Sequence, residues 1–143
     1  IGGPLRVAKR DPRITRQAYY AVTMHFDPAQ AEGLDRAQYI AALAAEGLSL
    51  GLPYDPVHRH PLMNLQHSTS PVPYRDPAVM QDYASLRLPN VERICSETGL
   101  VMMHRMLLSE PAYIDQLVGA VAKVNGNLGA AREHFAAQEA AAS

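Results

Sequence analysis

The 143-residue chain has one cysteine, two lysines and no tryptophan. Its length fits a single domain. The lone Cys95 excludes an internal disulfide and favours a reducing compartment such as the cytoplasm. A net charge of −1 leaves no basic excess for a general nucleic-acid or membrane-surface binder. No apolar run approaches the roughly 20 residues of a membrane helix. We therefore expect one cytoplasmic domain without a nucleic-acid or membrane partner.

The sequence also contains no motif that is typical of a metal site or a phosphate-binding site. The candidate metal ligands His58, His60, His67, Cys95 and His104 lack the paired short spacings that are typical of zinc sites, so we expect no metal. The chain has no glycine-rich phosphate loop and no strained serine elbow. Local motifs alone therefore predict no catalytic residue.

The first third of the chain alternates between strand and helix patterns. Residues 1–16 are basic and are expected to form an irregular N-terminal arm. Residues 17–26 alternate as a strand, a helix is expected from its N-cap Asp35 to Gly47, and residues 48–52 are expected to form a second strand. The first strand is expected to place four residues on one face: Tyr20, Val22, Met24 and Phe26.

The middle of the chain, residues 53–89, is rich in proline and is predicted to be a long loop. A short helix over about 77–86 is expected to interrupt this loop. Asn90 is then predicted to cap another short helix that ends at Gly99, and residues 100–103 are predicted to form a strand.

The last part of the chain is predicted to be helical. Ser109 is the expected N-cap, with Pro111 in the first turn, and residues 125–127 interrupt the pattern. The expected core stripe is Ile114, Leu117, Val118, Val121 and Val124. We therefore predict an α/β (α+β) fold in which about three strands pack with helices. The expected units are an arm over 1–16, a domain over 17–128 and an alanine-rich helical tail over 129–143.

A series of longer patterns carries more information than any local motif. In chain order they are Arg-x-x-Tyr-Tyr, Asp-Arg-x-x-Tyr-x-x-Ala-Leu-x-x-Glu-Gly, Gly-Leu-Pro-Tyr-Asp-Pro-Val-His-Arg-His-Pro-Leu, Leu-Pro-Asn-Val-Glu-Arg-Ile-Cys, His-Arg-Met-Leu-Leu and Ile-Asp-x-Leu-Val-x-Ala-Val-x-Lys-Val. In this order and spacing, over residues 11–128, the chain resembles the C-terminal third of the DegT/StrS-type aminotransferases. That family makes amino sugars, aminocyclitols and related antibiotic precursors.

The resemblance implies the small C-terminal domain of a fold type I aminotransferase. Such an enzyme uses pyridoxal phosphate to transfer an amino group to a keto-sugar or cyclitol ketone, and its small domain closes the substrate side of the site. The lysine that holds the cofactor belongs to the large domain. Lys9 and Lys123 do not match that lysine, so this chain is expected to bind no cofactor and to be inactive alone. The implied partners are the large domain or subunit and, in the complete enzyme, a second copy.

The same resemblance implies three substrate-binding residues: Tyr54, His58 and His104. His58 is expected to present a ring nitrogen to substrate hydroxyls while Tyr54 lines the pocket; the alternative is that His58 tethers its own loop. For His104 the alternative is a capping or packing role. Arg16 and Tyr20 are expected to be structural, as a salt bridge and a core aromatic.

Two other readings of the whole chain stay open at this point. The chain could be a free-standing, non-catalytic module that is related to the small domain and binds a partner or a large subunit. It could also be an unrelated binder that uses the histidine-rich loop for a small ligand or a metal. Because Ile1 is not a methionine, the chain could have lost a segment upstream; in the aminotransferase reading, that preceding segment would carry the cofactor lysine.

Overall fold

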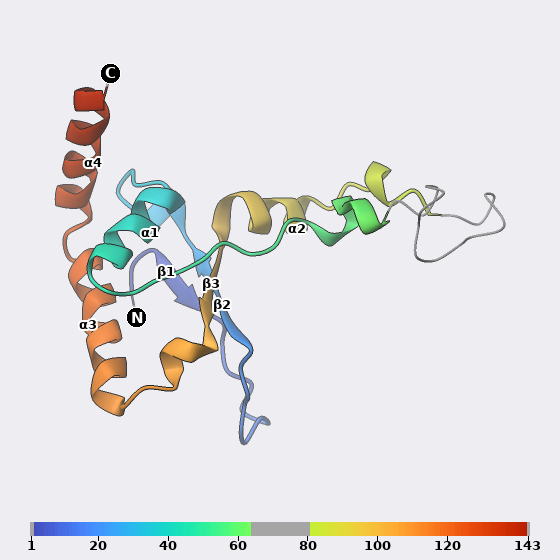
Figure 1. Cartoon of the computed structure of the whole chain (residues 1–143), viewed down its shortest axis with the longest axis horizontal. Coiled ribbons are helices and arrows are strands. Elements are labelled where there is room, and N and C mark those ends of the chain that lie inside the picture. Colours follow the sequence, from blue (N-terminus) through green and yellow to red (C-terminus); the bar gives the residue numbers. More distant parts are fainter. Residues whose placement is uncertain (1, 64–80, 143) are drawn as a thin grey trace.

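The computed structural model describes residues 2–63 and 81–142 and has a small antiparallel sheet at its centre (Figure 1). The sheet has the strand order β1-β2-β3. Its strands are β1 (Leu5–Val7), β2 (Ala21–Phe26) and β3 (Gly99–Met103). The expected α+β fold, in which three strands pack with helices, is confirmed.

Strand β1 lies inside the segment that was expected to be an irregular arm. Leu5 pairs with Phe26 on β2, and the Asp27 N–H donates to the Pro4 carbonyl at 2.7 Å. Leu5 and Pro4 are buried. The prediction of an irregular arm is therefore wrong at 5–7, because one leucine gives this short segment a place in the core. The wider division into three units stays a prediction.

The strand expected over 48–52 is reduced to one bridge beside β3. Gly51 and Val101 exchange both backbone hydrogen bonds, at 2.7 and 2.9 Å, and no ladder continues on either side. Pro53, which has no N–H, follows directly and cannot extend the pairing. Leu48 and Leu50 are nevertheless buried, so the segment packs as the sequence suggested without forming a strand.

Strand β2 shows the predicted alternation. Val22, Met24 and Phe26 are buried, whereas Thr23 between them is exposed. Tyr20 departs from the prediction because it lies just before the strand and is 69% exposed. Tyr20 is therefore not a core aromatic.

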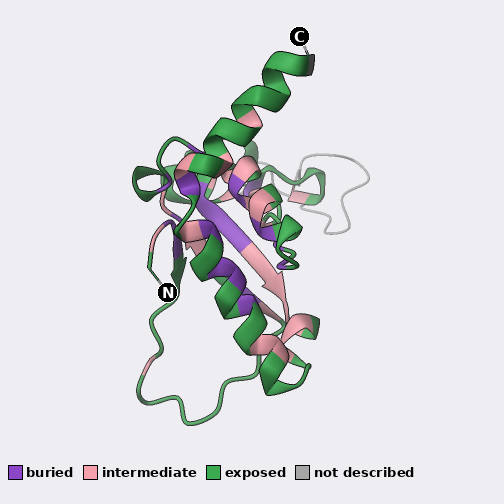
Figure 2. Cartoon of the chain, turned by 90° about the vertical axis from the view of Figure 1, so that its left-hand side faces the viewer, coloured by how far each residue is buried: buried purple, intermediate pink, exposed green. Residues whose placement is uncertain are grey.

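Four α-helices accompany the sheet, and Figure 2 shows that α4 is largely exposed along its length. Their bounds are α1 (Arg36–Ala45), α2 (Pro89–Arg93), α3 (Pro111–Asn125) and α4 (Leu128–Ala142). A π-helical turn, η6 (Ile94–Thr98), joins α2 to β3. No described helix has both the length and the apolar character needed to cross a membrane.

Helix α1 begins and ends as its sequence predicts. The Asp35 carboxylate accepts from the Gln38 N–H at 2.8 Å, and the Gln38 side chain accepts from the Asp35 N–H at 3.1 Å. This is a complete capping box. Gly47 follows the helix with φ of 89°, a left-handed conformation that glycine adopts without strain.

The other two predicted N-caps are wrong by one or two residues. Helix α2 begins at Pro89, so Asn90 lies inside it, and α3 begins at Pro111 with Glu110 at the N-cap in place of Ser109. In both helices proline occupies the first position, where its fixed φ suits a helix and its missing N–H costs nothing. The proline therefore sets the start, and no side chain caps either helix.

Most of the predicted stripe on α3 packs against the sheet. Leu117, Val121 and Val124 are buried, but Val118 is 47% exposed and lies outside the core. The interruption after Asn125 and the helical tail are confirmed, because α4 starts at Leu128.

The helix expected over 77–86 lies partly outside the described residues. Within them, a single 3-10 turn, η5 (Tyr83–Ser85), is present, and Asp82 caps it by accepting from the Ala84 N–H at 3.1 Å.

Tyr39 on α1 should make the domain sensitive to alkaline pH. It is fully buried against Phe26, and its hydroxyl donates to Asn125 Oδ1 at 2.7 Å. Burial raises the pKa of Tyr39 from 10.0 to about 12. The neutral phenol is thus favoured in the fold, so its stabilisation is complete below pH 10 and is lost as the pH rises from 10 towards about 12.

We expect Tyr39→Phe to lower the free energy of unfolding by about 1–2 kcal/mol at neutral pH, because Asn125 Oδ1 loses its donor. The variant should also lose much of the decline above about pH 10. Urea unfolding of both proteins across this range tests the prediction. Parallel decline of the two free energies would contradict it.

Candidate functional site

A cavity of about 610 Å³ lies on the sheet face opposite the buried side chains of β2. It is walled by Ala21 and Thr23 of β2, by Val101 and Met103 of β3, and by the chain just before β2 and just after the Gly51 bridge. Three tyrosines, Tyr19, Tyr20 and Tyr54, line it together with Gln17 and Arg105. The cavity therefore combines an apolar floor with phenol, amide and guanidinium groups.

Tyr20 and Tyr54 bring their phenols together at this cavity. Tyr54, predicted from sequence to line a substrate pocket, is 82% exposed and contributes to the wall. Hydrogen bonding with Tyr54, followed by charge repulsion from the same phenol, raises the pKa of Tyr20. The Tyr20 phenol therefore stays protonated at neutral pH, and phenol groups of this kind can donate or accept hydrogen bonds.

His104 lies next to Tyr20 but, unlike Tyr20 and Tyr54, is not among the residues that line the cavity. It directly follows β3 and opens the 3-10 turn η7 (His104–Leu107). Its Nδ1 lies 2.8 Å from the Tyr20 carbonyl oxygen, and the two rings are 6.1 Å apart. Because a carbonyl only accepts, Nδ1 carries the proton in this contact, and Nε2 of the neutral ring keeps its lone pair. Nε2 makes no hydrogen bond with any described residue.

His58 is separated from the other two predicted site residues. It lies in the 3-10 turn η2 (Val57–Arg59), only 6% of its side chain is exposed, and it does not line the cavity. Among the described residues its Nε2 has no hydrogen-bond partner and faces Glu92 Oε1 at 3.9 Å. The expectation that the loop prolines leave a ring nitrogen open to a substrate is therefore wrong, because the turn folds the ring inwards against α2.

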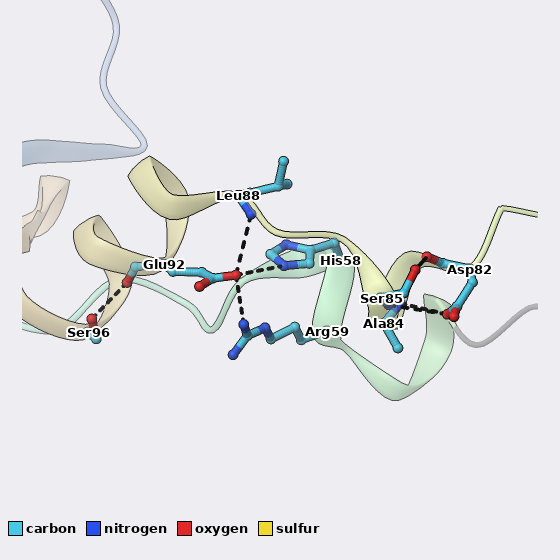
Figure 3. Close-up of polar contacts among 8 residues, drawn as sticks. All are labelled: His58, Arg59, Asp82, Ala84, Ser85, Leu88, Glu92 and Ser96. Atoms are coloured by element: carbon cyan, nitrogen blue, oxygen red, sulfur yellow. Dashed lines mark hydrogen bonds and ion pairs between the residues drawn. The ribbon is translucent and has the colours of Figure 1, made fainter.

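Glu92 is a functional candidate that sequence reasoning missed. Figure 3 shows its Oε1 at the meeting point of three groups: it accepts from Arg59 Nη2 at 2.7 Å and from the Leu88 N–H at 3.4 Å, and it lies beside His58. Partial burial raises the pKa of Glu92, but the Leu88 N–H and the charges of Arg59 and Arg87 outweigh it and keep this pKa below its ordinary value. The one sequence signal for Glu92 was the pattern Leu-Pro-Asn-Val-Glu, which contributed to the family resemblance.

The expectation of no metal site was drawn from the sequence. The structure shows where most of the candidate metal ligands lie. No three His, Cys, Asp or Glu side chains of residues 2–63 and 81–142 gather as a metal site. His58 and His60 do not point together, since His60 Nδ1 accepts from the Leu62 N–H at 3.2 Å while His58 faces Glu92. His67 lies outside the described residues.

The structure also shows where Arg16 and the two lysines lie. Arg16 is exposed and makes no ion pair with a described residue, so the expected salt bridge is not found there. Lys123 Nζ pairs with Glu46 at 2.8 Å on the helical side, and Lys9 is exposed in the N-terminal segment. Neither lysine lines the cavity.

Comparison with known proteins finds relatives over most of the chain, although no protein-family model matches it. A Streptoalloteichus tenebrarius protein is 36% identical over 137 residues, which is 92% of this chain. A Streptomyces kanamyceticus protein is 35% identical over 136 residues (90%), and a Micromonospora echinospora protein is 30% identical over 141 residues (93%). All three are provisionally named L-glutamine:3-amino-2,3-dideoxy-scyllo-inosose aminotransferase. The chain spans about a third of the length of these curated relatives, 32%, 31% and 32% respectively, and is thus similar to one part of proteins named as aminocyclitol aminotransferases.

Proposed function

We propose that the chain is the small C-terminal domain of a pyridoxal-phosphate-dependent aminotransferase that aminates a cyclic polyhydroxy ketone. The similarity of about nine-tenths of the chain to three proteins named as aminocyclitol aminotransferases carries this proposal. The tyrosine-lined cavity supports it, because its groups suit a polar ring. In this proposal the cavity forms part of the substrate side of the active site, in the biosynthesis of amino sugars or related antibiotics. The expected cytoplasmic location stays a prediction.

The proposed substrate contacts are Tyr54 and His104. The two phenols of Tyr20 and Tyr54 can each donate to and accept from ring hydroxyls, and His104 Nε2 can accept from one more. Aromatic faces also pack against the apolar face of a saturated ring. His58 was expected to bind substrate directly. Because its ring is buried, we propose instead that it stabilises the Tyr54 loop by packing beneath it.

The cofactor belongs to the proposed complete enzyme. When bound, pyridoxal phosphate supplies the electron sink for amino transfer, and it needs a lysine to hold it. The described residues do not fit that task, since Lys123 is paired with Glu46 and Lys9 is exposed, both away from the cavity. We therefore assign no catalytic or cofactor-binding residue to this chain.

The chain alone should not form a stoichiometric lysine adduct with pyridoxal phosphate. The physical reason is that no lysine lines the tyrosine cavity. Borohydride reduction of a mixture, followed by peptide mass mapping, tests this. Only slow, substoichiometric labelling of exposed lysine is expected. A single full-occupancy adduct at Lys9 or Lys123 would contradict the assignment.

The cavity face is the proposed contact with the large domain, and a homodimer is proposed for the complete enzyme. Large apolar side chains are exposed there, including Tyr20 at 69%, Leu52 at 57% and Tyr54 at 82%. Uncovered patches of this kind tend to mark interfaces. Sedimentation should show the isolated chain self-associating, and Leu52→Lys should weaken that association while the exposed control Glu97→Lys should not. A strictly monomeric parent chain would contradict this prediction.

Amino transfer by the complete protein tests the proposed function. L-glutamine, the amino donor in the names of the relatives, is supplied with scyllo-inosose derivatives and related cyclic ketones. The proposal expects an aminated ring as product. No transfer with any ketone, together with stable binding to a separate large subunit, would instead support a non-catalytic module.

A further inference from the structure

Two chain segments that are distant in sequence meet at the carboxylate of Glu92. Residues 53–63 and 81–93 project from the sheet side by side (Figure 1), and η2 and η5 are in contact. At the base of this projection, Glu92 Oε1 binds Arg59 at 2.7 Å and the Leu88 N–H at 3.4 Å (Figure 3). One side chain therefore joins the turn η2 to the start of α2.

The carboxylate itself is held in place and charged. The backbone carbonyl of Glu92 accepts a hydrogen bond from Ser96 Oγ at 2.8 Å. Among residues 2–63 and 81–142, the charged or titratable groups that face the carboxylate are Arg59 and His58 of η2 and Arg87 before α2. Two of these three are permanent cations, so Glu92 is ionised at neutral pH and attracts both segments.

A short segment with restricted backbone freedom connects Tyr54 to η2, so the position of η2 constrains that of Tyr54. Pro53 and Pro56 flank Tyr54, and their rings fix φ on both sides. Pro53 also lies so close to Gly99 that a side-chain carbon at Gly99 would come within 2.9 Å of it. The Tyr54 loop is thus anchored at one end by Pro53 against β3 and at the other end by Arg59 on Glu92.

We propose that Glu92 is a positioning residue for the cavity: its carboxylate holds η2 against α2 and so keeps Tyr54 beside Tyr20. The positional part of the proposal concerns this chain alone. Only its consequence for substrate use rests on the proposed function.

Two NMR measurements on Glu92→Ala test the positional part. Amide hydrogen exchange at Arg59 and His60, whose N–H groups donate within the turn, should accelerate by about 2- to 10-fold. The ring resonance of Tyr20 should titrate at a lower pH than in the parent chain, because the Tyr54 phenol that raises the pKa of Tyr20 is no longer held beside it. Tyr54→Phe gives the reference for a complete loss of that effect.

The matched control is Glu97→Ala, which removes an exposed glutamate from the adjoining turn η6. It should change neither measurement. The double variant Arg59→Ala/Glu92→Ala should exchange no faster than Glu92→Ala, because both single changes remove the same contact.

The proposal is overturned if Glu92→Ala leaves the Tyr20 titration unchanged, or if amides throughout the core exchange faster by the same factor. In the complete protein, Glu92→Ala should also raise KM for the ketone more than it lowers kcat. If the NMR effects are present and the KM effect is absent, the positioning by Glu92 stands and the substrate role of the cavity fails.

Discussion

His58→Ala is expected to lower the free energy of unfolding by about 1–3 kcal/mol. Only 6% of the His58 side chain on η2 is exposed, and its ring packs towards α2. Removing the ring therefore leaves space that the turn cannot fill without moving. The substrate-binding reading of His58 predicted the opposite result, in which substrate use falls and stability stays. Burial of the ring reverses the stability part of that expectation.

Urea unfolding measures this effect, with His60→Ala as the matched control. His60 is two residues away and exposed, and within the described part of the chain its ring accepts from the Leu62 N–H. The control should lose much less stability than His58→Ala. Equal free energies of unfolding for the parent chain and His58→Ala would contradict the buried position of the ring.

His104→Asn in the complete protein is expected to lower kcat/KM for the ketone by about 5- to 150-fold, which corresponds to about 1–3 kcal/mol. Asparagine can place an amide N–H near the position of Nδ1 and keep the contact with the Tyr20 carbonyl, which is 2.8 Å from Nδ1. It has no counterpart of Nε2, the proposed acceptor for a ring hydroxyl. Folding should therefore be preserved while substrate use is lost.

The control for His104→Asn is His134→Asn on α4, an exposed histidine that does not line the tyrosine cavity and whose ring bonds Gln138. Steady-state kinetics and melting temperatures are measured for both variants. If His104→Asn keeps the full kcat/KM, the ring has only the packing role that the sequence left open. If it unfolds the protein, the expectation that the Asn amide replaces the Nδ1 contact is contradicted.

The sequence predicted those elements whose pattern is local. The capping box at Asp35, the left-handed Gly47 and the alternation of Val22, Met24 and Phe26 each depend on residues a few positions apart. Periodicity and cap chemistry express such local preferences directly.

Contacts between distant segments could not be predicted in this way. Arg36 donates to the carbonyls of Cys95, Ser96 and Gly99, at 3.1, 2.6 and 3.0 Å, and so ties α1 to the turn before β3. Such long-range hydrogen bonds leave no periodic pattern in the sequence. They explain why the tertiary fold was harder to predict than its elements.

In the candidate site, too, single residues could be predicted from the sequence, but the contacts between distant residues could not. Tyr54 and His104 were predicted through the family resemblance. In the structure Tyr54 lines the cavity together with Tyr20, which the sequence had assigned to the core, while His104 contacts Tyr20 without lining the cavity. The buried His58 faces Glu92, which is more than thirty residues away along the chain, at 3.9 Å. Neither relation follows from spacing along the chain.

Single-turnover amination of the ketone by the complete protein tests the central claim, that this domain forms the substrate side of an aminotransferase. With Tyr54→Ala, the ketone half-reaction should slow by about tenfold or more while the half-reaction with L-glutamine keeps its rate, because Tyr54 is proposed to bind ring hydroxyls that the donor lacks. The control Val57→Ala changes an exposed residue of the same loop that does not line the cavity, and it should slow neither half-reaction. An unchanged ketone half-reaction in Tyr54→Ala, or equal slowing of both half-reactions, would contradict the account.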